Sequence, residues 1–429
     1  MNIAYLSADF GVPVFGFKGA SIHVREVTAA LRRQGHTVHL ISSAIAEEHA
    51  GEAELLAVPA QPSHAALFKE LSQLDAFLGV ETRVRHELRN LLYNFTLYEA
   101  ARDYLRQMPA EVIYERYSLF AYAGLKLART LGIPHLLEVN APLSHEQEKM
   151  RGLDLKVLAR HLEQRIWNET DRLLVVSTEL KQLALSMGVP AERIVVLPNG
   201  VDPARFLAVA AAGREWLAQR SGSRLCGPAV RAQWQLADKC VIGFVGSLKS
   251  WHGTETLVQA FEQMPAHTHL LVVGDGPQRE ALEQHVRTHI LGAQVTFTGK
   301  VPYDDIPAYI DAMDITVAPY TPNENFYFSP IKIYEYMMMA KPVVAGALGQ
   351  VAEIVASGQN GLLYEPGNVT ALRQALQQLA DDRERRKEMG KAGQAWVQRE
   401  RTWDHNATVI IRHAQALRDA GAQMKGAAA

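Results

Sequence analysis

The chain has 429 residues, 48% of them apolar and 21% charged, and its 44 basic and 46 acidic side chains give a formal net charge of −2. This length favours two domains, and the even charge balance argues against a nucleic-acid-binding protein. With only two cysteines, a disulfide framework and a cysteine-based zinc site are both excluded, and a reducing compartment is indicated.

The first residues do not form a targeting segment. The start of the chain lacks both a basic region and a long apolar stretch, so it is interpreted as a first strand. No apolar run approaches the length of a membrane span. We therefore expect a cytoplasmic protein, with peripheral contact at the cytoplasmic face of the membrane left open.

Short β-branched runs alternate with amphipathic helical stretches along the first half of the chain, which predicts a parallel sheet flanked by helices. After the first strand, at 3–7, a loop rich in glycine and aromatic residues spans 8–20. A helix should then run from about Ser21 to Gly35. Further strands are expected at 37–41, 111–114, 135–139, 172–176 and 193–197.

A second α/β series follows a break in the pattern at 203–232. Its strands are expected at 241–245, 269–273, 295–297, 315–317 and 342–345. The predicted fold class is α/β, with two Rossmann-like doubly wound parallel-sheet domains facing across a cleft, and ligands at the carboxyl ends of their strands. We expect an N-terminal domain at 1–205 and a C-terminal domain at 236–402. Between them, 206–235 is expected to be a linker or insertion that contains a helix near 215–219. The last part, 403–429, should form a helix that packs back toward the N-terminal domain, followed by a tail.

The segment 326–337 carries the strongest chemical signal. Ser329 suits a helix N-cap and Pro330 the first helical position. The free N–H groups of such a helix start favour an anion, and Lys332 adds a positive charge in the first turn. Glu335, one turn further, can accept two hydrogen bonds from a ribose diol. Taken alone, the segment is more simply interpreted as a capped helix with a local Lys–Glu pair.

A glycine-bounded loop at 246–253 follows the first strand of the second series. Gly246 and Ser247 are small enough for the backbone to approach a ligand closely. Lys249 can neutralise a phosphate, and His252 lies at the end of the loop. A solvated turn with a surface lysine is the simpler interpretation of this loop alone.

The first loop leads into a helix start. Lys18 offers a charge, and Gly19 and Ala20 offer a backbone surface for a diphosphate or an acceptor; the simpler interpretation is a mobile loop. The GxGxxG pattern is absent, and no acidic residue ends the second strand, which argues against a nicotinamide enzyme. Asn140 follows a predicted strand at the same sheet edge, whereas the Asn-Gly turn at 197–202 is interpreted as structural.

The motifs of the chain, and their order along it, resemble those of glycosyltransferase family 4, whose members have the GT-B fold. The subgroup resembled carries an SPxKxxEYM motif, and the resemblance covers nearly the whole chain. Singly the motifs are weak, and their order makes them specific. They lie at 19–21, 176–177, 197–202, 245–248, 273–277, 297–299, 335–337, 341–344, 353–355 and 360–363.

The resemblance implies a nucleotide-sugar donor site in the C-terminal domain and an acceptor site mainly in the N-terminal domain. Glu335 matches the second motif glutamate of the family, which holds the donor ribose. Main-chain groups near the sugar, the diphosphate and the base would come from Ser329, Pro330, Ile331, Lys300 and Val301.

The chain departs from the family pattern at four positions. Tyr327 stands where the first motif glutamate is usual, Ser247 and His252 where arginine and lysine are frequent, and Asn140 where many members have histidine. Lys249, or His252 if protonated, can substitute as the phosphate-binding charge. These departures keep an inactive homologue among the alternatives.

The resemblance implies a retaining transfer in which Lys249, Lys332 and the helix starts stabilise the leaving diphosphate. Asn140 would orient the sugar or the acceptor. No cofactor and no essential metal are expected, because the nucleotide sugar is a co-substrate and no DxD motif stands at a strand end. The donor is expected to be a UDP-sugar from its frequency in the family.

The acceptor is left open between a sugar, a glycan and a lipid-linked acceptor, as in exopolysaccharide or glycolipid synthesis, and so is the oligomeric state. The competing functions are a nucleotide-sugar 2-epimerase, a binding protein without catalysis and, last, a nicotinamide oxidoreductase.

Overall fold

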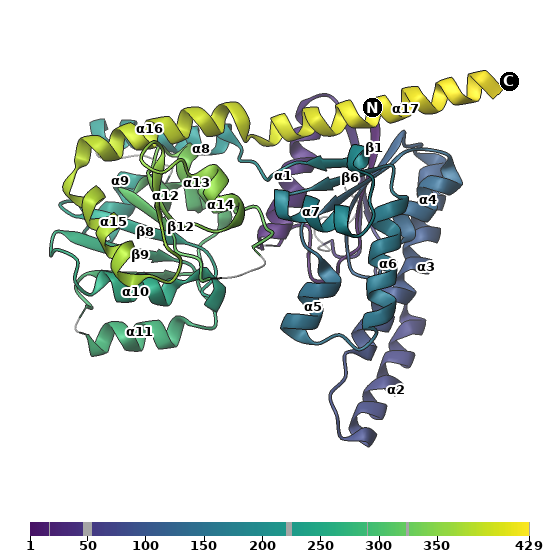
Figure 1. The fold of residues 1–429 in the computed structure, drawn as a ribbon, viewed down its shortest axis with the longest axis horizontal. Helices are drawn as coiled ribbons and strands as arrows, with labels where there is room; N and C mark the ends of the chain where they lie inside the picture. The colour runs from purple at the N-terminus through teal and green to yellow at the C-terminus, as the bar shows by residue number, and fades with distance from the viewer. Residues whose placement is uncertain (17, 46–53, 220–224, 290, 323–325, 429) are drawn as a thin grey trace. The chain divides into compact units, whose positions relative to one another are not determined.

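The computed structural model describes residues 1–16, 18–45, 54–219, 225–289, 291–322 and 326–428. The chain forms two compact units. The first consists of Met1–Pro198 together with Trp403–Ala429, and the second is Asn199–Thr402. Each unit is a parallel sheet covered by helices, and each is described by itself (Figure 1).

The first unit is built on a seven-stranded parallel sheet in the order β3-β2-β1-β4-β5-β6-β7. Its inner strands are almost wholly buried, as expected for a parallel sheet covered on both faces. The strands are β1 (Asn2–Ser7), β2 (Thr37–Ser42), β3 (Leu55–Ala57), β4 (Val112–Arg116), β5 (His135–Val139), β6 (Arg172–Val175) and β7 (Ile194–Val196).

Eight α-helices surround this sheet in the described part of the first unit. Tyr93, Leu97 and Leu105 of one long helix pack with Leu127 of the next against the strands. The helices are α1 (Gly19–Arg33), α2 (Pro62–Leu78), α3 (Val84–Gln107), α4 (Ala123–Leu131), α5 (Leu143–Arg151), α6 (Lys156–Glu169), α7 (Thr178–Ser186) and α17 (Trp403–Ala428).

The second unit has a six-stranded parallel sheet in the order β10-β9-β8-β11-β12-β13. One face packs on helices α8, α9, α12 and α13, and the other on α10, α11 and α15. The strands are β8 (Cys240–Val245), β9 (Thr268–Val273), β10 (Val295–Gly299), β11 (Ile315–Ala318), β12 (Val343–Gly346) and β13 (Gly361–Tyr364). The helices are α8 (Pro203–Gln219), α9 (Gly227–Gln233), α10 (Thr254–Phe261), α11 (Arg279–Thr288), α12 (Ile306–Asp311), α13 (Ile331–Met338), α14 (Gly349–Ile354), α15 (Val369–Asp381) and α16 (Arg383–Glu400).

The segment expected to be a linker at 206–235 is instead part of the second unit where it is described. The boundary falls after Pro198 rather than at residue 205, and most of the segment is taken up by α8 and α9. Phe206 and Val209 are fully buried in the core of the unit. The alanine-rich composition that resembled a linker therefore forms a helix, because alanine favours helices and the apolar side chains have a core to pack against.

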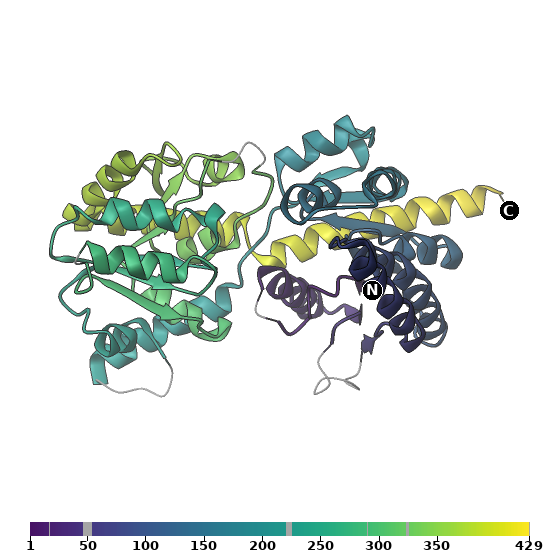
Figure 2. The same cartoon turned by 90° about the horizontal axis from the view of Figure 1, so that it is seen from below.

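The last helix, α17, packs along α1 of the first unit (Figure 2). Trp403, at its start, is 1% exposed, and its ring lies 5.0 Å from that of His23 on α1. Asn406 donates a hydrogen bond of 2.7 Å to the carbonyl oxygen of Pro198. The helix is thus a buried component of the first unit. In the described residues, no helix is long and apolar enough to cross a bilayer.

Candidate active site

Three glycines bring two loops of the second unit into backbone contact. Gly246 follows β8 with φ 149°, and Gly274 and Gly276 follow β9 with φ 138° and 159°. A Cβ on Gly276 would lie 2.7 Å from the amide nitrogen of Leu248, so a side chain there would separate the loops. The carboxyl edge of this sheet is therefore lined by main chain packed closely on main chain, and in α/β folds this edge is where ligands approach the backbone.

Lys332, on the first turn of α13, extends its ammonium beneath Gly246. A Cβ on Gly246 would lie 2.7 Å from Lys332 Nζ. Part of the side chain reaches the surface, but Nζ is buried and has no hydrogen-bond acceptor among the described residues. It lies 4.3 Å from the ring centroid of Phe244 and 5.4 Å from that of Tyr320. Burial lowers the pKa of Lys332 to about 7, an effect that Glu335 partly opposes.

A buried ammonium with ring contacts and no acceptor is expensive in a free protein. The cost is recovered when an anion enters, because a charge-assisted hydrogen bond forms in a region of low dielectric. The second unit thus buries an ammonium that has no acceptor in the described residues next to a glycine-lined backbone.

His252 contacts the same region but is not a cation. Its Nδ1 donates to the carbonyl oxygen of Ser247, which requires a proton on Nδ1. Burial, with the positive charge of Lys332, lowers the pKa of His252 to about 3. The neutral ring therefore offers an Nε2 lone pair, and the expectation that a protonated His252 replaces the family lysine is wrong for the free protein.

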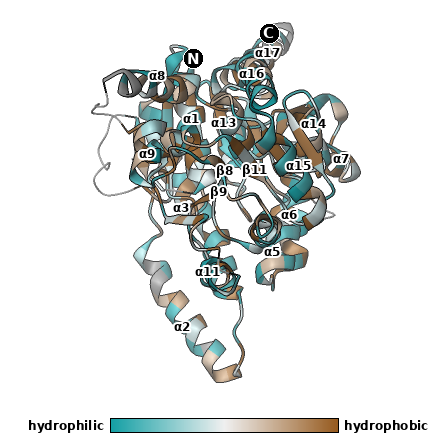
Figure 3. Cartoon of the chain, turned by 90° about the vertical axis from the view of Figure 1, so that its left-hand side faces the viewer, coloured by the Kyte–Doolittle hydropathy of each residue, from teal (hydrophilic) through white to brown (hydrophobic). Residues whose placement is uncertain are grey.

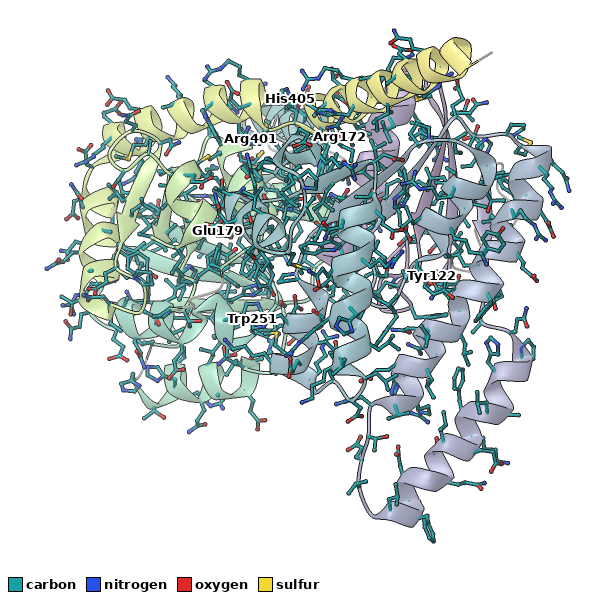
Figure 4. The ribbon with its side chains drawn as sticks, turned by 45° about the vertical axis from the view of Figure 1, so that its right-hand side comes forward. Tyr122, Arg172, Glu179, Trp251, Arg401 and His405 are labelled. Atoms are coloured by element: carbon teal, nitrogen blue, oxygen red, sulfur yellow. The ribbon has the colours of Figure 1, made fainter. Side chains whose placement is uncertain are left out.

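Lys249 lies on the same loop, and its Nζ stands 4.6 Å from the ring centroid of Trp251 (labelled in Figure 4). Its ammonium is held by an aromatic face on the loop itself, in contrast to the buried ammonium of Lys332. Lys332 is the better candidate of the two for the phosphate-binding charge.

The start of α13 differs in detail from the sequence expectation. The helix begins at Ile331 and Pro330 occupies the N-cap, so Ser329 does not cap it. Ser329 Oγ instead accepts 3.0 Å from the amide nitrogen of Asn199, whose Nδ2 donates 2.8 Å to the Ser329 carbonyl oxygen. Ser329 thus anchors the Asn-Gly turn to the helix start, because a buried serine satisfies the neighbouring backbone in preference to its own helix.

Glu335 lies on α13 one turn beyond Lys332 and is 5% exposed. Its Oε1 accepts a 3.0 Å hydrogen bond from Tyr303 Oη, which follows the loop expected to hold the base. In that loop Lys300 is exposed and Val301 packs on the core. The structure therefore brings Glu335 and the 300–303 loop together.

Tyr327 belongs to a group of aromatic side chains before α13. Phe326 and Phe328 lie 4.1 Å apart by ring centroids, Tyr327 contacts Phe328, and Tyr320 contacts both phenylalanines. The place of the usual first glutamate is thus taken by an aromatic side chain, in a group of which Tyr320 contacts the Lys332 ammonium. The rings of Tyr320 and Phe244 help to shield that ammonium from water.

In the first unit, the loop expected to bind a phosphate provides a helix start, but its lysine is bonded within the loop. Helix α1 begins at Gly19, followed by Ala20, and its N-cap Lys18 makes no side-chain cap. Lys18 Nζ donates 2.8 Å to the carbonyl oxygen of Gly11, within its own loop. Gly19 and Ala20 offer a helix start at the carboxyl end of β1, while the charge of Lys18 is turned to the loop.

A buried polar cluster at the carboxyl edge of the first sheet was missed by sequence reasoning, apart from Asn140. Its centre is Glu138, the penultimate residue of β5. Tyr114 Oη and Asn140 Nδ2 donate to Glu138, Arg116 donates over 3.2 Å, and His23 Nε2 lies 3.3 Å away. The only sequence signal was an acidic residue inside an otherwise apolar strand, next to Asn140.

The protonation of this cluster follows from its donors. Burial acts to raise the pKa of Glu138, but the adjacent His23 and Arg116 and the bonds from Tyr114 and Asn140 outweigh it, and the pKa lies below its usual value. Arg116 lies 3.5 Å from His23 Nδ1 and can only donate, so Nδ1 carries a lone pair. Burial lowers the pKa of His23 to about 4, which agrees with a neutral ring donating from Nε2. The amide of Asn140 is anchored on Glu138 through its Nδ2.

Two family models match the chain. The description Glycosyltransferase Family 4 applies to residues 17–205, and Glycosyl transferases group 1 applies to residues 239–382. The 2-deoxystreptamine glucosyltransferase of Streptomyces kanamyceticus is 30% identical over 324 residues, 72% of this chain and 78% of that protein. A GDP-mannose-dependent phosphatidylinositol monomannoside mannosyltransferase of Mycobacterium tuberculosis is 29% identical over 62% of this chain and 66% of its own length.

Solved structures share the architecture. Sucrose-phosphate synthase of Thermosynechococcus elongatus aligns with TM-score 0.73 and 22% identity over 98% of this chain and 99% of its own. Anabaena HepE, in complex with UDP, aligns with TM-score 0.72 and 20% identity over 97% and 100%. The fold is GT-B, as the sequence predicts. The chain belongs to the family 4-like glycosyltransferases and is a glycosyltransferase.

Proposed function

We propose that the protein is a retaining glycosyltransferase that moves a sugar from a nucleotide-sugar donor, a UDP-sugar in the first instance, to a hydroxyl acceptor in glycan, exopolysaccharide or glycolipid synthesis. One observation carries the donor half of the proposal. The Lys332 ammonium is buried, without an acceptor in the described residues, below the backbone of Gly246. A diphosphate would supply the negatively charged hydrogen-bond acceptor that this ammonium lacks.

The donor lies along the carboxyl edge of the second sheet in this proposal. The ribose hydroxyls donate to Glu335, the base pairs with main chain at Lys300 and Val301, and the diphosphate meets Lys332 and the backbone from Gly246 to Ser247. The backbone of Ser329, Pro330 and Ile331 lies toward the sugar. Support comes from the Glu335–Tyr303 hydrogen bond, which links α13 to the base-binding loop.

In the reaction, the bond between the anomeric carbon and the diphosphate oxygen breaks. The acceptor oxygen bonds to that carbon on the same face, and the acceptor proton passes to a phosphate oxygen. Negative charge grows on the leaving diphosphate, so preorganised donors supply most of the catalysis. Lys332 is the main donor in this proposal and Lys249 a second. The chemistry requires no side-chain nucleophile, cofactor or essential metal.

Asn140 orients the acceptor or the transferred sugar through its Oδ1, as proposed from its anchoring on Glu138. Gly19 and Ala20 add a helix start at the same edge of the first sheet, and Lys18 lies beside it. The acceptor is a sugar, a glycan or a lipid-linked glycan, and the relatives named above act on unlike acceptors.

The donor is tested by calorimetry and thermal shift with UDP, GDP, ADP and their sugars, using wild type, Glu335→Ala and the control Glu388→Ala, an exposed glutamate of the same unit. The expected result is selective binding of one nucleotide, UDP in the first instance, about 100-fold weaker in Glu335→Ala and unchanged in the control. Equal binding in all three proteins would remove Glu335 from the site.

The reaction is tested by NMR on the identified donor with and without acceptors. Transfer with the anomeric configuration of the donor is expected, in chelator as well as with manganese. An inverted product, or activity that returns only with manganese, would contradict the mechanism. Conversion of the donor without an acceptor would indicate an epimerase, and binding without turnover an inactive homologue.

A further inference from the structure

A second group of potential ligands lies in the second unit, outside the site described above. Glu262, which follows α10, and His285 and His289, at the end of α11, each present one ligand atom, and all three atoms lie within 4.8 Å of one another. Helices α10 and α11 cover the face of the sheet opposite α13. Helix α11 consists largely of hydrophilic residues (Figure 3).

The two histidines are four residues apart and therefore occupy one face of the helix end. Their rings stack with centroids 4.2 Å apart and planes inclined by 24°. His285 Nε2 lies 2.6 Å from Glu262 Oε1. Two imidazoles and a carboxylate thus converge from two helices that contact each other.

The proton on His289 is placed by its neighbour. Nδ1 stands 2.9 Å from the backbone carbonyl oxygen of His285, which can only accept, so Nδ1 carries the proton. Nε2 is then a lone pair. Donation from the other ring nitrogen to a backbone carbonyl is how a metal-ligating histidine is commonly held.

The positive charges of α11 lie on another row of the helix. Arg279 pairs with Glu283 at 2.7 Å, and Arg287 approaches Glu283 at 4.0 Å. This row is offset by two residues from the histidines, which is about half a helical turn. The arginines are therefore directed to a different face from the histidine–glutamate group.

We propose that Glu262, His285 and His289 bind one zinc ion, or a transition metal of similar chemistry, that joins the end of α10 to the end of α11. Imidazole and carboxylate ligands suit zinc better than magnesium or calcium. Ligand atoms around a tetrahedral zinc are separated by about 3.3 Å. On binding, the Glu262–His285 contact opens, the proton of the neutral His285 ring moves from Nε2 to Nδ1, the wider separations close by side-chain rotations, and water is the fourth ligand. The role is structural and separate from glycosyl transfer.

The test uses metal-stripped protein without a polyhistidine tag. Zinc is titrated at neutral pH against a chromophoric chelator, with wild type, His289→Ala, Glu262→Gln and the control His161→Ala, an exposed histidine on α6. One zinc per chain is expected in wild type and control. Affinity should fall at least about tenfold in both site variants, since each loses one ligand. Saturating zinc should raise Tm of wild type by about 3–8 °C, and magnesium should not.

Two results would overturn the proposal. The first is wild type that binds no zinc, which would leave His285 and Glu262 as a surface ion pair. The second is equal affinity in wild type, His289→Ala and Glu262→Gln, which would place the ion elsewhere. The two variants alter partly exposed side chains, and circular dichroism verifies that both are folded.

Discussion

A charged side chain is buried at the carboxyl edge of each sheet, but only one of the two is satisfied by hydrogen bonds in the described residues. In the first unit, Glu138 receives three hydrogen bonds and has His23 beside it. In the second, the Lys332 ammonium has no hydrogen-bond acceptor in the described residues. A satisfied charge fixes the side chains around it, whereas an unsatisfied one is completed by a ligand. In the proposed function, Glu138 accordingly has a positioning role and Lys332 a binding role.

The largest effect is expected from Lys332→Met, which keeps the length of the side chain and removes its charge. Transfer should slow about 100- to 1000-fold, because a main donor to the leaving diphosphate is lost. The free protein should become more stable by about 1–4 kcal/mol, since an uncompensated buried ammonium is replaced by an apolar group. Steady-state kinetics and denaturant unfolding measure the two effects.

Lys387→Met, a surface substitution on α16, is the control and should change neither quantity. A Lys332→Met variant that is less stable than wild type and fully active would show that the Lys332 charge stabilises the free protein and does not serve transfer, which would contradict the comparison between the two edges.

A smaller loss is expected from Glu138→Gln in the first unit. The neutral amide cannot hold Arg116 and Asn140 as a carboxylate does, and kcat/KM for the acceptor should fall about 10- to 100-fold. Calorimetry should show unchanged nucleotide affinity, which distinguishes a role at the first edge from one at the second. The exposed Glu99→Gln serves as control. Weakened nucleotide binding with normal acceptor kinetics would contradict the assignment.

Gly246→Ala probes the space above Lys332 directly. The new Cβ would lie 2.7 Å from Nζ, and φ of 149° at this position disfavours a side chain. Nucleotide affinity should fall about tenfold, because the ammonium and the loop must both shift. The matched control is Gly292→Ala, where a Cβ meets nothing within 4 Å. Equal affinity of the two variants would show that the backbone at Gly246 does not face the ligand.

The smallest effect concerns pH. Burial lowers the pKa of Lys332 to about 7 from 10.5, so the destabilisation from its charge is complete below about pH 7 and fades as the pH rises through 7 toward 10.5. A diphosphate binds the protonated form, so nucleotide affinity should fall by up to about tenfold between pH 7 and pH 8.

Calorimetry in buffers of different ionisation enthalpy should show proton uptake on binding, and Lys332→Met should show none from this group. Affinity of wild type that does not vary with pH would argue against a neutral Lys332 in the free protein.

Most of the strands were predicted from the periodicity of apolar residues, and the two strands that were missed share a cause. Strands β3 and β13 have three and four residues and are the outermost members of their sheets. Short edge strands carry too little pattern to be recognised. The linker prediction at 206–235 failed because alanine and glycine do not distinguish a loop from a tightly packed helix: Gly227 is required by its close contact with Asp311.

At the site, residue types were predictable and their environment was not. Lys332 and Glu335 were singled out by their spacing on one helix. The absence of an acceptor for Lys332 in the described residues depends on Phe244 and Tyr320, which come from other parts of the chain. The neutral state of His252 likewise depends on a tertiary contact. Glu138 was overlooked because its donors come from three separate elements.

The first unit is discontinuous in the sequence, which affects its synthesis. Its 198 N-terminal residues are complete long before α17 is translated, yet Trp403, Ala407, Ile410 and Ala414 of that helix are buried. On the ribosome, the nascent first unit therefore waits with an exposed apolar strip while the whole second unit is made and folds. A stop codon before residue 403 would therefore leave the core of the N-terminal unit incomplete, although the missing residues lie at the other end of the sequence. A chaperone that binds the apolar strip would likewise bind the first unit.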